Sequence, residues 1–241
     1  MKAILLSLIF SGVAYGKTYT ANPQRTILII GEIETNILKE ADHLLKLSPI
    51  SSSQKEPITI LVNSPGGRVD TGMFFINQMQ ISQQRGYVLN CVSGIMAASM
   101  GFQILAHCDN VYVLKHTKLL FHPPSYLTNA PLTEKDLAYL LGEIKEIEHD
   151  LRSELLIKFR FNIAMFDYHF QRETMWEAYR LAKHTKKIQI VTDVINLDTF
   201  LLKLTRPPSL LDLLRQARPR NYFVPTISPR IMYIHPSNIE K

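Results

Sequence analysis

The sequence predicts an α/β fold built as a single domain. Apolar strand segments alternate with segments whose apolar residues recur at helical spacing, which indicates a β/α spiral rather than a β sandwich. With 241 residues, 46% of them hydrophobic, the chain can bury one substantial core and still leave a tail.

The predicted elements follow in a regular order along the chain. An opening strand within residues 25–33 and a first helix are followed by the polar loop Ser51–Pro57 and the apolar strand Ile58–Val62. A second helix then has apolar residues at helical spacing, and three more strands follow it. The helix residues are Val69, Met73, Ile76 and Met79, and the strands are Tyr87–Cys91, Asn110–Leu114 and Lys118–Phe121.

A long, protruding helix is predicted from Thr133 to about Phe159. Thr133 is the expected N-cap, and Asp136 completes a pair like a capping box. Its apolar residues recur at spacings of three and four: Leu137, Leu140, Leu141, Ile144, Ile147, Leu151 and Leu155. Such a stripe packs either against the rest of the chain or against another subunit.

Ser99 is the candidate nucleophile. It lies in the run Gly94–Gly101, where small residues such as Ala97 and Ala98 let a substrate approach the hydroxyl closely. A serine in the first turn of a helix also lies at the positive end of the helix dipole, which favours the negative charge that develops as its proton leaves. Because a free hydroxyl scarcely ionises at neutral pH, Ser99 needs a base.

His122 is the candidate base. A neutral imidazole can take the serine proton and return it to a leaving amine. His122 follows an apolar strand and precedes two prolines that cannot continue a central strand, so we expect its ring at a strand end.

The turn Asn63–Gly67 is the candidate oxyanion loop. It joins a strand to a helix, and Gly66 and Gly67 can adopt positive φ and leave backbone amides uncovered. Such amides can hold a developing oxyanion.

These segments resemble the Clp protease proteolytic subunit family, within the wider crotonase-like fold. Arg25–Ile33 is similar to that family's opening strand, Asn63–Gly67 to its oxyanion loop, Ala97–Gly101 to its nucleophile motif and Phe121–Pro123 to its histidine motif. The resemblance covers about residues 25–195. It implies catalytic roles for Ser99 and His122, an oxyanion hole formed by the amides of Gly67 and Met100, and a long helix that interlocks stacked rings of subunits.

The third catalytic residue departs from the family pattern. The family carries an Arg-Asp pair at a position where this chain reads Gln171–Ala178, so Glu173 replaces the aspartate and about three residues are missing before Glu177. Asp167 is the competing acid. Either carboxylate can orient the imidazole, and a serine-histidine dyad or an inactive site is the alternative.

The N-terminus resembles a secretory signal peptide. Lys2 precedes a short apolar stretch, and Ala14 and Gly16 are small residues of the kind that a signal peptidase reads. We therefore divide the chain into a signal peptide (1–16), a peptidase domain (17–202) and a basic, proline-rich extension (203–241). The expected location is periplasmic or secreted, or cytoplasmic if the N-terminus is not cleaved and serves as a strand or membrane anchor.

Export bears on the cysteines and on the partners. Cys91 and Cys108 can pair in an oxidising compartment, but buried thiols are an equal alternative. The Clp family receives unfolded chains from an ATP-driven unfoldase, and an exported copy lacks the ATP for one. The expected partners are therefore peptide or polypeptide substrates and further copies of the chain.

The positive charge is concentrated in the C-terminal extension. Seven Lys and Arg residues against two acids there account for +5 of the formal net charge of +6. Because the folded part is close to neutral, we expect no nucleic-acid partner. The extension packs on a neighbouring subunit, contacts an anionic membrane surface, or is a loose soluble tail.

The sequence thus predicts a serine endopeptidase that needs no cofactor or metal. Two alternatives are an inactive ring-forming or regulatory paralogue and a crotonase-type enzyme acting on an acyl thioester. The second would share the oxyanion loop but has no need of Ser99 paired with His122.

Overall fold

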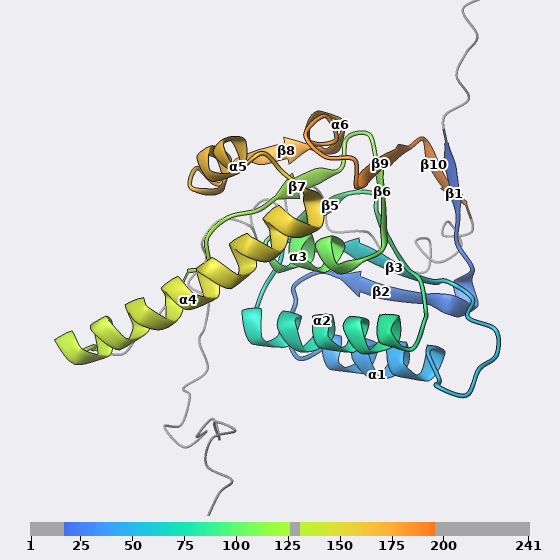
Figure 1. Cartoon of the computed structure of the whole chain (residues 1–241), viewed down its shortest axis with the longest axis horizontal. Helices are drawn as coiled ribbons and strands as arrows, with labels where there is room; N and C mark the ends of the chain where they lie inside the picture. The colour runs from blue at the N-terminus through green and yellow to red at the C-terminus, as the bar shows by residue number, and fades with distance from the viewer. Residues whose placement is uncertain (1–16, 126–130, 196–241) are drawn as a thin grey trace, which may run out of the picture.

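The computed structural model describes residues 17–125 and 131–195 (Figure 1). Its α/β architecture confirms the predicted fold class. The proposed signal peptide and the whole basic extension lie outside the described residues. In the described part of the chain, no helix is both long enough and apolar enough to cross a membrane.

A five-stranded parallel sheet forms the centre of the molecule. Its strands lie in the order β2 (Thr26–Ile30), β3 (Ile58–Asn63), β4 (Leu89–Ser93), β6 (Asn110–Leu114) and β9 (Ile188–Val191). Every residue of β3 is buried, as expected for an inner strand of a covered parallel sheet. Two helices, α1 (Ile37–Leu47) and α2 (Val69–Gln84), lie side by side along one face of this sheet (Figure 1).

A smaller sheet lies beside the first and holds the segments around the candidate site. Strand β5 (Met96–Ala98) pairs in parallel with β7 (Lys118–Leu120), which pairs antiparallel with β8 (Met175–Glu177). A parallel bridge between Ser64 and Ala97 joins the loop after β3 to β5. The loop with the two glycines is therefore tied directly to the strand that precedes Ser99.

The remaining elements are short, apart from one. Helix α3 (Met100–His107) follows β5, and α5 (Ile163–Phe170) and α6 (Ala178–Leu181) flank β8. A two-stranded parallel sheet joins β1 (Thr18–Thr20) to β10 (Asp193–Ile195), and a 3-10 turn spans Pro23–Arg25. Strands β1, β5, β8, β9 and β10 and helices α5 and α6 were not predicted, because three or four strand residues or one or two helical turns carry too little periodicity.

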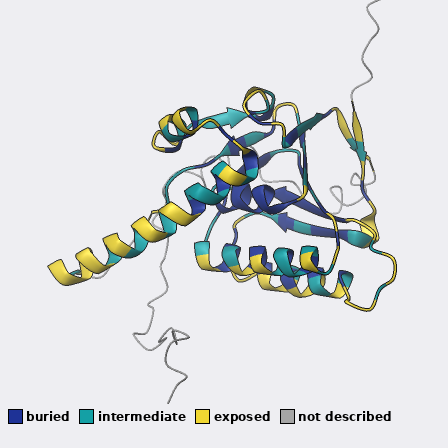
Figure 2. Cartoon of the chain, in the orientation of Figure 1, coloured by how far each residue is buried: buried dark blue, intermediate teal, exposed yellow. Residues whose placement is uncertain are grey.

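The long helix α4 (Glu134–Phe159) forms an arm that extends away from the body (Figure 1). Both hydrogen bonds of the predicted capping box between Thr133 and Asp136 are present. Only the C-terminal part of the helix packs on the body, as the burial colours show (Figure 2). Farther out, Leu137 and Leu141 are 48% and 55% exposed.

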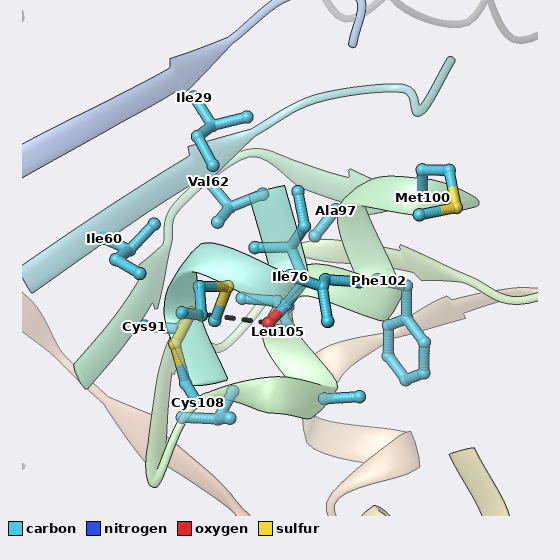
Figure 3. Packing of buried hydrophobic residues seen from close by; sticks show 14 of the residues in the cluster. Ile29, Ile60, Val62, Ile76, Cys91, Ala97, Met100, Phe102, Leu105 and Cys108 are labelled. Atoms are coloured by element: carbon cyan, nitrogen blue, oxygen red, sulfur yellow. Dashed lines mark hydrogen bonds between the residues drawn. A yellow bond between two sulfur atoms is a disulfide. The ribbon is translucent and has the colours of Figure 1, made fainter. Parts of the chain in front are cut away.

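The main core lies between the large sheet and its helices, and buries residues of β3, β4, α2 and α3 together (Figure 3). A disulfide joins Cys91 in β4 to Cys108 directly after α3, with 5.7 Å between their Cα atoms. The structure thus pairs the two cysteines that the sequence left open. The bond ties the C-terminal end of the helix that follows Ser99 to a central strand.

Candidate active site

Ser99 occupies the sharp turn between β5 and α3. Its backbone has φ 53° and ψ −123°, a conformation that costs a residue other than glycine about 1–3 kcal/mol. Two kinds of hydrogen bond hold it there: its N–H donates to the carbonyl of Leu120 at 2.9 Å, and its carbonyl accepts from Phe102 and Gln103 of α3. Ser99 is therefore the N-cap residue, one position before the helix in which the sequence placed it.

The glycine loop touches the Ser99 side chain. A Cβ atom on Gly66 (φ +107°) would lie 2.5 Å from Ser99 Cβ, which no real pair of carbons tolerates. A Cβ on Gly67 (φ +149°) would lie 2.3 Å from the carbonyl oxygen of Ile33 on the other side of the loop. Glycine is thus needed at both positions for the loop to pass between Ile33 and Ser99.

Two backbone amides of this loop bond within the protein, and a third does not. The Gly66 N–H donates to Ser64 Oγ at 3.0 Å, and the Arg68 N–H donates to the Ile33 carbonyl at 2.8 Å. The Gly67 N–H between them has no hydrogen-bond acceptor among residues 17–125 and 131–195. It is available for a ligand.

Met100 supplies a second such amide. As the first residue of α3 it has no preceding helical turn to bond to, and its N–H has no acceptor in the described segments. The amides of Gly67 and Met100 are the ones that the resemblance to the Clp family implies for the oxyanion hole.

His122 and Ser99 line one cavity of about 20 Å³. Its other lining residues come from α2, α3, α4 and the segment after β7: Val69, Met100, Gln103, Phe121, Pro124, Leu151 and Leu155. No hydrogen bond joins Ser99 to His122 in the part of the chain that the structure describes. Catalytic hydrogen bonds are often long without substrate and tighten when substrate binds.

The two candidate acids have different surroundings. Glu173 Oε1 lies 3.9 Å from His122 Nδ1, beyond hydrogen-bond length, and the Glu173 side chain is 68% exposed. Asp167 instead accepts two hydrogen bonds of 2.8 Å from Arg152 and so joins α5 to α4. The structure therefore brings Glu173 to the histidine and commits Asp167 to an ion pair. Nδ1 of His122 is buried without a hydrogen-bond partner in the described residues.

The sequence analysis missed Gln103 as part of this cavity. Gln103 lies four residues after Ser99, so the helical repeat places it one turn farther along α3. That spacing was the available signal, but an amide in an apolar helix does not by itself indicate which way the side chain faces.

Comparison with known proteins shows the family of the chain. A family model described as Clp protease matches residues 13–196. The chain belongs to the Clp protease family. It is 33% identical over 110 residues to the ATP-dependent Clp protease proteolytic subunit 2 of Thermobifida fusca, a match that covers 42% of this chain and 49% of that protein. The protein of the same name from Pseudomonas aeruginosa is 30% identical over 103 residues, with the same shares covered.

The chain spans about half the length of these curated relatives. Family membership supports serine peptidase chemistry at the level of the family. In residues 17–125 and 131–195, no group of three or more His, Cys, Asp and Glu side chains is arranged to hold a metal ion.

Proposed function

We propose that this protein is a serine endopeptidase that hydrolyses peptides or unfolded polypeptides through an acyl-enzyme at Ser99. The observation that carries the proposal is the convergence on Ser99. Ser99 lies in a strained turn against Gly66 of the glycine loop, and His122 lines the same cavity. The amides of Met100, the next residue, and of Gly67 in the loop have no acceptor among the described residues.

The chemistry proceeds in two transfers. Ser99 Oγ attacks the carbonyl carbon of the scissile bond as His122 Nε2 takes its proton, and the amides of Gly67 and Met100 hold the resulting oxyanion. The C–N bond then breaks, His122 returns the proton to the leaving amine, and the acyl group stays on Ser99. A water molecule, deprotonated by His122, hydrolyses that ester and restores the hydroxyl.

Glu173 is the acid that we propose faces His122 Nδ1. Its carboxylate favours the tautomer and the charged form of the imidazole that the mechanism uses. Because it is 3.9 Å away and 68% exposed, solvent screens much of its charge. We therefore assign it a modest contribution.

An inactive, ring-forming or regulatory role is the second candidate function. The observation that favours it is that Nδ1 of His122 has no hydrogen-bond partner in the described residues, since an unoriented imidazole is a poor base. Activity-based labelling separates the two proposals.

A fluorophosphonate probe tests the peptidase directly. The full-length protein should become labelled, and Ser99→Ala should not. His122→Ala should label far more slowly because the serine loses its base. As a control, Ser82→Ala removes another buried serine, which lies in α2 and contacts Ser48, and should leave labelling intact. Absence of Ser99-dependent labelling in correctly folded protein would favour the inactive paralogue.

The arm α4 supports a proposal of homo-oligomer formation. The outer half of this 26-residue helix leaves an apolar stripe without a partner in the described chain. Replacing Leu137 and Leu141 by Ser should lower the assembly mass measured by light scattering. Lys135→Ser, on the same helix, should leave it unchanged.

Export remains part of the proposal. The Cys91–Cys108 disulfide supports it, because such bonds persist in oxidising compartments. Mass spectrometry of the mature protein should find that it begins at residue 17, after cleavage behind Gly16. The mature chain then consists of the peptidase domain, from residue 17 to about 202, and the extension 203–241. An exported enzyme acts on peptides or loosened chains without an ATP-driven unfoldase.

Deleting residues 206–241 tests whether the extension packs on a neighbouring subunit, since an unchanged oligomer excludes that role.

A further inference from the structure

Gln103 is a buried polar residue beside the candidate nucleophile. It lies on α3 one turn after Ser99, is 4% exposed and lines the cavity that Ser99 and His122 share. Its side-chain Nε2 donates to the carbonyl of Leu151 in α4 at 3.1 Å. Its backbone carbonyl accepts from Nδ1 of His107 at 2.8 Å. Both ends of the residue are thus held in place.

The other end of the Gln103 amide has no partner. Oε1 is buried, and no donor in the described residues reaches it. The orientation of the amide follows from Leu151, because a carbonyl oxygen can accept only from the NH₂ side. A buried acceptor without a donor is costly and uncommon, so it points to a donor that arrives from outside the chain.

Most of the described cavity wall offers no hydrogen-bond donor. Apart from Ser99, His122 and Gln103, the lining side chains are apolar: Val69, Met100, Phe121, Pro124, Leu151 and Leu155. The cavity of about 20 Å³ has room for one small polar group of the size of a water molecule or a hydroxyl. A larger side chain, including that of threonine or valine, enters only if these walls move apart.

We infer that Gln103 sets substrate preference by accepting a hydrogen bond from a hydroxyl-bearing side chain, threonine or serine, on the residue that forms the acyl-enzyme. This inference rests on the proposed function, because the cavity borders the serine to which that residue becomes attached. Valine has nearly the shape of threonine but offers no donor, so it leaves Oε1 unpaired. A site with a buried polar group rejects the analogue that lacks the matching partner.

The test compares two fluorogenic peptides that differ only in threonine or valine before the scissile bond. We expect the full-length enzyme to cleave the threonine peptide with a kcat/KM about tenfold higher, the usual effect of one neutral hydrogen bond. Gln103→Met keeps the side-chain volume but removes the acceptor, and should bring the ratio close to one. Gln103→Leu is a second apolar variant should Gln103→Met fold poorly.

Gln83→Met is the matched control. Gln83 on α2 donates to the carbonyl of His107 at the opposite end of α3, so this variant also removes a glutamine contact to the helix. Because Gln83 does not line the cavity, the threonine preference should persist.

Three results would overturn the inference. The first is a wild-type ratio near one, which is also expected if Oε1 binds only a water molecule. The second is a threonine preference that Gln103→Met or Gln103→Leu retains in full. In both cases Ser99 still reacts with the fluorophosphonate probe, so the proposed function survives. Failure of Ser99 to react is the third result, and it removes the proposed function together with this inference.

Discussion

Gly66→Ala tests the claim that the glycine loop sets the position of Ser99. The added Cβ would lie 2.5 Å from Ser99 Cβ, 2.9 Å from the Ala98 carbonyl oxygen and 3.1 Å from Ser99 Oγ. The two nearest atoms are a backbone oxygen and a Cβ bonded directly to backbone, so backbone must move. The position also has φ +107°, which alanine adopts only with strain.

Two separate costs give the size of the effect. Backbone strain and overpacking each cost about 1–3 kcal/mol, so we expect the free energy of unfolding to fall by about 2–6 kcal/mol. Restoring an ordinary carbon contact of at least 3.4 Å moves Ser99 or the loop by roughly 1 Å. A displacement of that size lowers the rate of an oriented reaction by about 100-fold.

Two further glycines separate these effects. Gly31 has φ +80° but nothing within 4 Å of its Cβ position, so Gly31→Ala should lose only about 1–2 kcal/mol and should label at the wild-type rate. Gly142 lies in α4 with open space around it and no positive φ, so Gly142→Ala should be neutral or more stable by up to about 1 kcal/mol.

Urea denaturation measures the stabilities, and the rate of fluorophosphonate labelling measures the reactivity of Ser99. If Gly66→Ala labels as fast as Gly31→Ala, the loop does not position the nucleophile, and our assignment of the oxyanion amides loses its basis.

Three more predictions follow from the site and its supports. Glu173→Gln should slow labelling of Ser99 by about tenfold at most, since the exposed carboxylate is 3.9 Å from His122 Nδ1. If labelling slows by about a thousandfold instead, the working enzyme forms a direct hydrogen bond between Glu173 and His122. Cys108→Ala should lower the free energy of unfolding by about 3 kcal/mol, as expected for a disulfide across 17 residues. Adding dithiothreitol to this variant should have no further effect on its stability. If the variant is as stable as the wild type, the cysteines are unpaired. Burial lowers the pKa of Lys187 to about 8 from 10.5, so between these values the unfolded chain binds more protons and stability rises with pH. Solvent at this half-buried amine reduces the gain to about 1–2 kcal/mol, and Lys187→Met should abolish it in urea titrations at pH 7.5 and 10.

Much of the fold could be predicted because its signals are local. Strand β3 and helix α2 were visible as an apolar run followed by helical spacing, and the N-cap of α4 follows from Thr133 and Asp136 alone. The short strands β5 and β8 could not be predicted, since three residues acquire strand geometry only by pairing with β7.

Some residues of the candidate site could likewise be predicted from the sequence, and others could not. Ser99, His122 and Gly67 each lie at the end of a strand or in the turn that follows, so short motifs reveal them and parallel strand order brings them together. The acid does not lie in such a motif. The choice between Glu173 and Asp167 depends on Arg152, which engages Asp167 from a different helix and so leaves Glu173 as the acid facing His122.

Residue order and periodicity were therefore sufficient for the α/β class and the long arm, and short motifs were sufficient to propose a candidate nucleophile, a candidate base and a loop of amides. The pairing of Cys91 with Cys108, the engagement of Asp167 by Arg152 and the unpartnered oxygen of Gln103 became known only in three dimensions. The physical reason is that motifs act through neighbours in the chain, whereas these features depend on distances between side chains that packing sets across separate elements. Burial adds to this difference, because a polar atom lacks a partner only once packing has removed the water that would otherwise bond to it.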